Sequence, residues 1–454
     1  MNNRHISLSL YVRRWLCLCI AIFPMVLRAQ YYTHILDSNI KTLRVRYVET
    51  EQLQRPFLVL GQNGVDGADP NNTLEVSFDE LTHDIHQYSY TIHHLNRNWT
   101  PSDLNSYEYV RGFTTADIID YALSNNTQQA YTHYSFNFPN DAMQLLVSGN
   151  YALTIHRDGD LDKPVAVVTF AVVEPIVSIS ANVRSNTDIE FNGRYQQLDI
   201  DVHTEDLDMR DHNEVCVVVR QNNRLDNQVT LSSPTFIEPE RLRYVNQRAL
   251  IFEGGNEFRH FDAYSVYYAG YHVDKIRYAQ GEYHTFLEPD ELRGTLAKGA
   301  GREGVPYSTE HDNNGQLQIN AEQTDDDDTD AEYMWVHFCL PVETPIADAN
   351  IFVGGGIFLN QFTADNLMTY NGQQQCYFLS AYLKQGAYDY MYYVLRSKMK
   401  SLRANTGVPS LLEIEGSHWQ TQNEYSVYVY HRPFCGRYDR LVGYYTTTAV
   451  NGEK

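Results

Sequence analysis

The stretch Thr73-Leu74-Glu75-Val76-Ser77-Phe78 alternates apolar and polar side chains, and the acidic pair Asp79-Glu80 that follows it is typical of a turn. Alternation with a period of two places the apolar side chains on one face of an extended strand. The same pattern returns at Tyr88-Ser89-Tyr90-Thr91-Ile92. Two such segments so close together predict neighbouring strands that share an apolar face.

Residues 145–156 and 165–173 extend this pattern further along the chain. The stretch Asp158-Gly159-Asp160 between them is rich in residues that favour tight turns, so the two segments predict a β-hairpin. Together with the strands above, they predict an N-terminal β-sandwich over residues 30–174.

The rest of the chain also contains short segments with the pattern of β-strands. Short apolar segments after Pro175 predict a second β-sandwich over residues 175–285. Residues 286–331 are rich in glycine and aspartate and predict a linker with long loops. Residues 332–454 predict a C-terminal sandwich of the early-set type. With 35 tyrosines, which suit pleated and half-buried surfaces, the chain is expected to be all-β, built from tandem immunoglobulin-like or early-set β-sandwiches.

Residues 1–29 have the composition of an export signal. Arg4, Arg13 and Arg14 are basic, the apolar run 16–27 is short for a bilayer span, and Leu27-Arg28-Ala29 is suitable for cleavage. We therefore expect a signal peptide that is cleaved near Ala29. An uncleaved membrane anchor is the alternative interpretation of the same run.

The chain is strongly acidic. It has 35 lysines and arginines against 57 aspartates and glutamates, a formal charge of −22. The leader carries four arginines and no acid, so its removal leaves −22 − 4 = −26. Such a charge repels nucleic-acid phosphates and anionic lipid. We expect a protein that binds no nucleic acid and has no membrane span of its own.

The cysteines leave the disulfide state open. Two of the six lie in the leader, and the other four allow three pairings. These four are Cys216, Cys339, Cys376 and Cys435. Cys216 lies in an apolar run of valines, which favours a buried free thiol.

Neither histidines nor acids predict a metal site. The clustered histidines are His83, His86, His93 and His94. Two of them, His93 and His94, are adjacent on an expected strand, so their side chains point to opposite faces and do not converge on one ion. The run Asp325-Asp326-Asp327-Asp328 lacks the glycine and glutamate of a calcium-binding loop and is expected to be a solvated loop.

Catalytic patterns are also missing. Gly354-Gly355-Gly356 is followed by Ile357-Phe358-Leu359, which is expected to continue as strand, whereas a phosphate-binding loop opens a helix. Lys298-Gly299 has the reverse order of a phosphate loop. Carboxylate pairs such as Glu253 and Glu257 carry little information in so acidic a chain. We expect no enzyme, no cofactor, and no catalytic or metal-binding residues.

Several longer stretches carry a resemblance to a known family. They are Leu74–Leu81, Tyr88–Ser102, Tyr109–Phe113, Tyr131–Tyr134, Phe138–Asn140, Ser148–Tyr151, Glu253–Arg259, Leu383–Gly386, Glu415–Ser417, Thr421–Asn423 and Arg437–Gly443. In this order, over essentially the whole mature chain, they resemble the plug protein family of the type 9 secretion system of Bacteroidota. Leu95 departs from the family, in which a cysteine is expected, and this difference concerns local packing.

The resemblance implies a non-catalytic, monomeric, periplasmic protein associated with the outer membrane after signal-peptide cleavage. It would close the inner end of a giant outer-membrane β-barrel translocon while no cargo is engaged. No family binding residue is transferred to this chain. Trp99, Tyr107 and Tyr109 are candidate contacts on an expected loop, and the alternative for Trp99 is a place in the core of the first sandwich.

A second interpretation is glycan binding. The stretches 351–355, 368–371 and 383–390 are similar to early-set sandwiches that carry carbohydrate-binding modules. Phe358 and Phe362 flank Asn360 where such modules often carry tryptophan, which weakens this alternative. A row of exposed, coplanar aromatic rings would support it.

Overall fold

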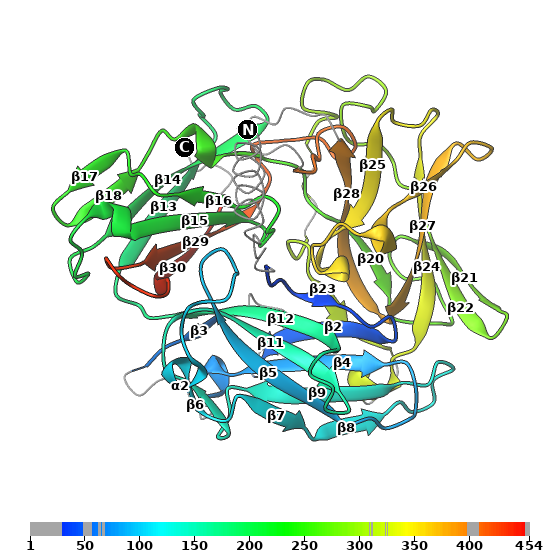
Figure 1. Cartoon of the computed structure of the whole chain (residues 1–454). Coiled ribbons are helices and arrows are strands. Elements are labelled where there is room, and N and C mark those ends of the chain that lie inside the picture. Colours follow the sequence, from blue (N-terminus) through cyan, green and yellow to red (C-terminus); the bar gives the residue numbers. More distant parts are fainter. Residues whose placement is uncertain are drawn as a thin grey trace, which may run out of the picture. The chain divides into compact units, whose positions relative to one another are not determined.

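The computed structural model describes residues 30–48, 57–61, 65, 69–307, 309, 312–322, 324, 326–396 and 408–449. The expected signal peptide at residues 1–29 lies outside the described residues. Apart from Gln30, the described residues belong to one compact unit, Tyr31–Lys454. Almost all of its regular structure is antiparallel β-sheet (Figure 1), so the predicted all-β class with tandem sandwiches is confirmed.

The first sandwich packs two main sheets around one apolar core. The first sheet holds β1 (His34–Ile35), β3 (Phe57–Val59), β5 (Tyr88–Leu95), β7 (Thr115–Ile118), β11 (Gly149–Arg157) and β12 (Pro164–Val173). The second holds β2 (Ile40–Tyr47), β4 (Leu74–Glu80), β8 (Asp120–Leu123) and β9 (Thr132–Phe138). Smaller elements are β6 (Val110–Gly112), β10 (Met143–Leu145), the 3-10 helix η1 (Pro70–Asn72) and the helix α2 (Ser106–Tyr109).

The alternating sequence of this sandwich determines which side chains are inside. Leu74, Val76 and Phe78 on β4 are all buried in the core. The predicted hairpin is confirmed, because β11 and β12 pair antiparallel with Leu153 opposite Val168. The expected turn at Asp79-Glu80 is wrong, because both residues still belong to β4 and are buried.

The second sandwich is built from two separate parts of the chain. One sheet contains β13 (Ser178–Arg184), β14 (Tyr195–His203), β17 (Phe236–Glu238), β18 (Arg241–Tyr244) and β19 (Ile251–Glu253). The other contains β15 (Val215–Gln221), β16 (Val229–Leu231), β29 (Glu424–His431) and β30 (Arg440–Thr448). Short 3-10 helices are η2 (His212–Glu214) and η3 (Arg248–Leu250).

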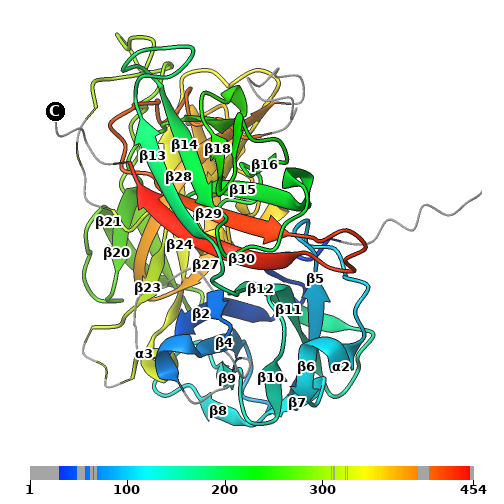
Figure 2. The same ribbon diagram turned by 90° about the vertical axis from the view of Figure 1, so that its left-hand side faces the viewer.

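This arrangement differs from the predicted boundaries. The sequence predicts a C-terminal sandwich over residues 332–454, whereas β29 pairs with β15 of the second sandwich, with Val217 opposite Val429. Alternation in β29 shows which residues share a face but not which strand lies beside it. In Figure 2, β29 and β30 lie next to β15, far from it in sequence.

The third sandwich begins at residue 259 and includes much of the expected linker. One sheet contains β20 (Arg259–Ala263), β23 (Leu317–Ile319), β25 (Ala349–Gly354) and β28 (Gly386–Arg396). The other contains β21 (Val273–Ala279), β22 (Glu282–Leu287), β24 (Tyr333–Pro341), β26 (Thr369–Asn371) and β27 (Cys376–Lys384). Helical turns are α3 (Asp327–Asp330), η4 (Gly356–Phe358) and η5 (Ala364–Asn366). The strand expected at residues 357–359 is therefore wrong, since η4 occupies that place.

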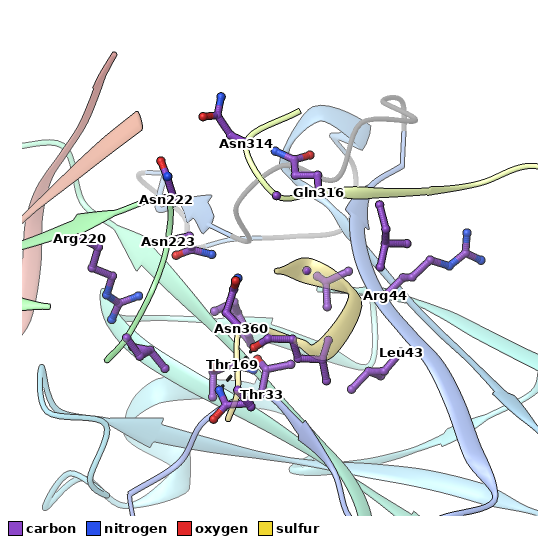
Figure 3. Close-up of a pocket in the computed structure, with 18 of the residues that line it drawn as sticks. Thr33, Leu43, Arg44, Thr169, Arg220, Asn222, Asn223, Asn314, Gln316 and Asn360 are labelled. Atoms are coloured by element: carbon purple, nitrogen blue, oxygen red, sulfur yellow. Dashed lines mark hydrogen bonds between the residues drawn. The ribbon is translucent and has the colours of Figure 1, made fainter. Parts of the chain in front are cut away.

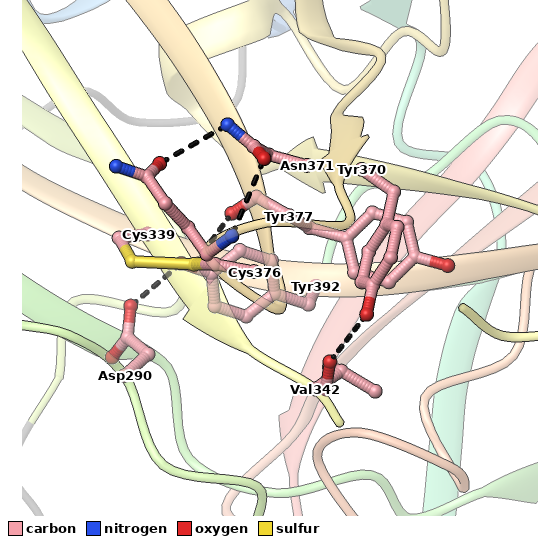
Figure 4. The surroundings of a disulfide bond; sticks show 9 residues. Asp290, Cys339, Val342, Tyr370, Asn371, Cys376, Tyr377 and Tyr392 are labelled. Atoms are coloured by element: carbon pink, nitrogen blue, oxygen red, sulfur yellow. Dashed lines mark hydrogen bonds between the residues drawn. A yellow bond between two sulfur atoms is a disulfide. The ribbon is translucent and has the colours of Figure 1, made fainter. Parts of the chain in front are cut away.

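A disulfide joins two neighbouring strands of the third sandwich. Cys339 on β24 is bonded to Cys376 on β27 (Figure 4). Cys216 is a buried free thiol, as predicted, and Cys435 is free and exposed. Only one of the three possible pairings contained this bond, and the sequence could not select it.

The first and second sandwiches share an apolar contact. Ala171 and Val173 on β12 pack against Cys216 and Val218 on β15 and against Tyr430 on β29. These side chains lie on the faces of β12 and β15 that point away from each sandwich's own main core. The two sheets are therefore apolar on both faces, which explains the almost continuous apolar sequence of both strands.

Candidate interaction surfaces

The first sandwich has an apolar edge that is exposed. β8 is the outermost strand of its sheet, in the order β2-β4-β9-β8, and β7 is the outermost strand of the other sheet. Ile119, Tyr121 and Leu123 follow each other at spacings of two and are 78%, 49% and 42% exposed. Figures 1 and 2 show both strands on the side of this sandwich away from β12. We call Ile119, Tyr121 and Leu123 the β8 edge.

The β8 edge has the properties of a binding surface. Tyr121 lies opposite Tyr134, a buried core residue, so Tyr121 is on the core-facing side of the sheet, yet it is 49% exposed. Phe113, between β6 and β7, is also 69% exposed. Proteins usually protect strand edges with charges or cover, because an apolar edge readily pairs with another chain. The β8 edge therefore fits contact with a partner.

The third sandwich carries exposed tyrosines, and one of them, Tyr278, lies near the loop that follows β8. Tyr267 and Tyr278 are 82% and 55% exposed. The hydroxyl of Tyr278 donates a hydrogen bond to Oε1 of Gln128 at 3.1 Å, and Gln128 belongs to that loop. Tyrosine suits interfaces because it combines a large ring with a hydroxyl that can form hydrogen bonds. The two sandwiches thus meet close to the β8 edge.

The three aromatic residues proposed as contacts lie in different environments. Trp99 is buried, in a small apolar cluster with Leu95 and Val167 that is separate from the main core. Tyr109 is buried and donates a hydrogen bond to the carbonyl oxygen of Ile92 at 3.3 Å. Of the three, only Tyr107 is exposed.

A buried charge network joins the first sandwich to the third. Nζ of Lys384 on β27 lies 2.7 Å from Oδ2 of Asp79 on β4. The hydroxyl of Tyr333 donates to the same oxygen at 2.7 Å, and Nδ1 of His133 lies 2.6 Å from Oδ1. Burial alone would raise the pKa of Asp79, but Lys384 and His133 outweigh it and hold the pKa at about 2. Asp79 therefore stays ionised, with every oxygen satisfied.

The acidic run contributes to the same contact. Asp328 forms an ion pair with Arg44 on β2, and Tyr131 donates a hydrogen bond to the carbonyl oxygen of Ala331 at 2.9 Å. Asp326 caps α3, where its side chain accepts the N–H of Asp328 at 2.9 Å. The expectation of a solvated loop is therefore wrong for Asp328, which is half-buried and paired, whereas Asp326 is exposed. Asp325 lies outside the described residues.

Other charged groups of the third sandwich also have structural partners. Arg259 donates to Asp290 at 2.8 Å and to Glu415 at 3.0 Å. Tyr390 and Tyr392 donate to Asp290 at 2.8 and 2.6 Å. Burial acts to raise the pKa of Asp290, but Arg259 and His272 hold it at about 2. This cluster holds the loop after β22 against β20 and β28.

The histidines predicted not to form a metal site are separated. His83 contacts Oγ of Ser124, His86 contacts Glu80, and His94 contacts Ser102. Within the described residues, no group of three or more histidines, cysteines or acids is placed to hold a metal ion.

The aromatic pair proposed for glycan binding does not form an open platform. Phe362 is half-buried and packs edge-on against Phe352 and Tyr393, at interplanar angles of 74° and 67°. Phe358 is half-buried against the core of the third sandwich. Neither ring matches the exposed, coplanar row that sugar stacking requires.

Three sandwiches that share buried contacts, together with an exposed apolar strand edge, define a multidomain β-sandwich protein suited to binding another protein. Residues 40–174 match the family model described as type 9 secretion system plug protein 1st domain. The first sandwich is therefore similar to the first domain of type 9 secretion system plug proteins. The match covers the first sandwich from β2 to the end of β12.

A solved structure is similar over nearly the whole chain. It is the crystal structure of a hypothetical protein from Parabacteroides merdae ATCC 43184. The TM-score is 0.83 at 34% identity, and the alignment covers 92% of this chain and 100% of that one. A search of curated proteins gave no match.

The family suggests a non-catalytic role, interaction with a component of the secretion system, and a periplasmic or outer-membrane-associated location. Within the described residues, no helix has the length and apolar character needed to cross a membrane.

Proposed function

We propose that this protein is a periplasmic plug of the type 9 secretion system. After cleavage of residues 1–29, it docks as a monomer on the inner end of the outer-membrane β-barrel translocon. It occludes that barrel while no cargo is engaged. The observation that carries the proposal is the family match over residues 40–174, the sandwich that also presents the β8 edge.

Occlusion requires a body that does not deform when it is pushed into an opening. A barrel wide enough for folded cargo leaks small molecules unless a rigid body covers it. Asp79 and Lys384 join the first and third sandwiches, and Ala171 and Val173 join the first to the second. Buried contacts of this kind favour movement of the three sandwiches as one body.

The β8 edge is the proposed docking site. Its backbone edge can add to a strand of the partner, and Tyr121 and Leu123 can be buried on contact. Such contacts bind through apolar burial and main-chain hydrogen bonds, and they release again when a competing segment covers the partner's edge. This agrees with a plug that docks reversibly.

The test is recovery of the partner from detergent-solubilised outer membranes with the tagged full-length protein. We expect one very large β-barrel protein in stoichiometric amount. The double variant Tyr121→Lys, Leu123→Lys should lower recovery about tenfold or more, because two charges would enter the contact. The matched control is Phe236→Lys on β17, another exposed aromatic residue on an edge strand.

Two outcomes contradict the proposal. Recovery of the protein without a β-barrel, together with retention on an immobilised polysaccharide, would replace docking by glycan binding. Equal losses in the β8 variant and the Phe236 control would reject the β8 edge as the docking site.

A further inference from the structure

A pocket of about 200 Å³ lies where the three sandwiches meet. Its walls come from β2 and β12 of the first sandwich, from the turn after β15 of the second, and from two turns of the third. Figure 3 shows Arg220 on one side of this space and Leu43 with Arg44 on the other. The volume is below the roughly 300–1,000 Å³ of sites for drug-sized ligands. It therefore suits a small group or the end of a chain.

Arg220 supplies a buried positive charge at this pocket. Arg220 is only 5% exposed. The guanidinium carbon lies 5.2 Å from the ring centre of Trp99 and 5.0 Å from that of Tyr428, and Nε donates to Gln228 at 3.0 Å. Among the described residues, no carboxylate forms an ion pair with Arg220. A buried guanidinium with unused donors is costly unless an anion satisfies it.

Amide side chains converge on the same space from two sandwiches. Asn223 comes from the second sandwich, and Asn314, Gln316 and Asn360 come from the third (Figure 3). All four are half-buried, and within the part of the chain that the structure describes none of these amides has a hydrogen-bond partner. An amide both donates and accepts, which matches the alternating donors and acceptors of a peptide backbone.

The turns that carry these amides are held in place. Oδ2 of Asp389 accepts the N–H groups of Asn313 at 2.6 Å and Gly315 at 3.2 Å. The N–H of Gly356 donates to the carbonyl oxygen of Gly315 at 2.6 Å, and a Cβ on Gly356 would lie only 2.7 Å from that oxygen. The glycine run at residues 354–356 thus brings the two turns together.

Leu359 presents Asn360 in an unusual conformation. The two residues have positive φ values of 53° and 54°. A leucine in the left-handed region is rare and strained, so surrounding contacts must hold it there. The side chain of Leu359 packs against the core of the first sandwich. The backbone that carries these amides is therefore held in place before a ligand binds.

We propose that this junction pocket binds the carboxyl-terminal end of a peptide. The terminal carboxylate lies on Arg220, the amides of Asn223 and Asn360 bond the last peptide groups, and the last side chain lies against Leu43 and Leu359. An extended chain end presents just this combination of one anion, amide groups and one apolar side chain. The inference stands apart from the proposed docking.

An acidic sugar shares the carboxylate but fits less well. Sugar rings bind through stacking on aromatic faces, and the Arg220 guanidinium already lies over Trp99 and Tyr428. The other wall offers apolar side chains, Leu43 and Val45, which have no use for sugar hydroxyls. The observations therefore favour a peptide end.

The test uses the full mature protein and fluorescence anisotropy. The probes are short glycine-serine peptides that end in leucine, alanine or phenylalanine and carry a dye at the amino terminus, each made with a free and with an amidated end. Glucuronate serves as the acidic-sugar probe in competition. We expect at least one free-acid peptide to bind about tenfold or more tightly than its amide, because a charged hydrogen bond is lost.

Variants distinguish the pocket from other surfaces. Asn360→Asp places a carboxylate in the pocket and should weaken free-acid binding about tenfold. Asn182→Asp makes the same change at an exposed residue of β13 and should leave binding unchanged. Arg220→Gln should abolish the preference for the free acid. If this variant does not fold, Asn360→Asp still tests whether the peptide binds in the pocket.

Three results with the peptide probes would overturn the proposal. They are equal affinity for acid and amide, unchanged affinity in Asn360→Asp, and absence of peptide binding at 1 mM, roughly the weakest affinity of interest. Binding of glucuronate without binding of peptide would also overturn it, and would assign the pocket to sugar acids.

Discussion

The ammonium group of Lys384 lies 2.7 Å from a carboxylate oxygen of Asp79, although the two residues belong to different sandwiches and are 305 positions apart. Their side chains are 0% and 1% exposed. Nζ also lies 4.3 Å from the ring centre of Tyr131. A pair of opposite charges without access to water is stable only while both partners are present. The contact between the first and third sandwiches therefore depends on this pair.

Removal of one partner should be more harmful than removal of both. Lys384→Met leaves Asp79 charged and buried, and we expect about 3–5 kcal/mol lower free energy of unfolding in urea. The double variant Asp79→Leu, Lys384→Met should recover much of this loss. Lys298→Met breaks an exposed pair with Glu343 and should have no measurable effect. Equal losses in the single and double variants would contradict this account.

Acid should destabilise the protein through the same carboxylate. Because the pKa of Asp79 is about 2 in the folded chain and 3.8 ordinarily, the folded state holds this proton less tightly than the unfolded state. Ionised Asp79 therefore contributes about 2 kcal/mol to the free energy of unfolding above pH 4, and this contribution is lost as the pH falls from about 4 to 2. Urea titrations over this range should show a shallower decline for Asp79→Asn than for the wild type. Parallel declines would mean that Asp79 is not the responsible group.

Local patterns in the sequence predicted the strands well but not their partners. Alternation at Leu74, Val76 and Phe78 predicts one buried face of the strand. Which side chains share a face depends only on their spacing in the sequence. The buried position of Asp79 depends on Lys384, a residue in another sandwich, and no local pattern contains that information. For the same reason the sequence did not reveal that β29 pairs with β15.

The candidate surfaces were predictable to a smaller extent. Apolar side chains at Tyr121 and Leu123 look in sequence like those of any half-buried strand, and alternation does not show that they lie on an exposed edge strand. Trp99 fits the alternative of a core residue, since it is buried in a small core cluster beside Arg220. Positive φ values are shared by Asn222, Asn223, Asn314 and Asn360, and the preference of asparagine for such turns is the one sequence signal that could have pointed to the junction pocket.

Asp312 should give the opposite pH dependence from Asp79. Burial raises the pKa of Asp312 to about 7, although its carboxylate accepts the N–H of Asn314 at 3.0 Å. The folded state therefore holds this proton more tightly than the unfolded state. Protonated Asp312 makes its full contribution to the free energy of unfolding below about pH 4, and this contribution is lost as the pH rises to about 7. Asp312→Asn should gain stability relative to the wild type by about 4 kcal/mol at most between pH 4 and 8.

The measurement is urea unfolding of both proteins at several pH values. Asp365→Asn, at an exposed position of η5, serves as the control and should track the wild type. If the difference between Asp312→Asn and the wild type stays constant with pH, Asp312 does not titrate in this range.

The disulfide between Cys339 and Cys376 should stabilise the third sandwich. It closes a loop with a sequence separation of 37 residues, for which the loss of chain entropy in the unfolded state predicts about 2–4 kcal/mol. Reduction, or the double variant Cys339→Ser, Cys376→Ser, should lower the melting temperature by several degrees. Cys435→Ser, at an exposed free thiol, should leave it unchanged under the same conditions. A melting temperature unaffected by reduction would show that strand pairing alone holds β24 to β27.

Truncation tests the discontinuous second sandwich most directly. A chain that ends at residue 423 lacks β29 and β30, so β15 loses the partner that satisfies one side of its backbone from Val215 to Gln221. Val217 and Val219 also lose their contact with Val427 in the shared core. Hydrogen exchange at the β15 amides should therefore become faster by several orders of magnitude, whereas β4 and β9 in the first sandwich should stay protected. If β15 kept its protection, the second sandwich would be complete without the C-terminal strands, and the boundaries predicted from sequence would stand.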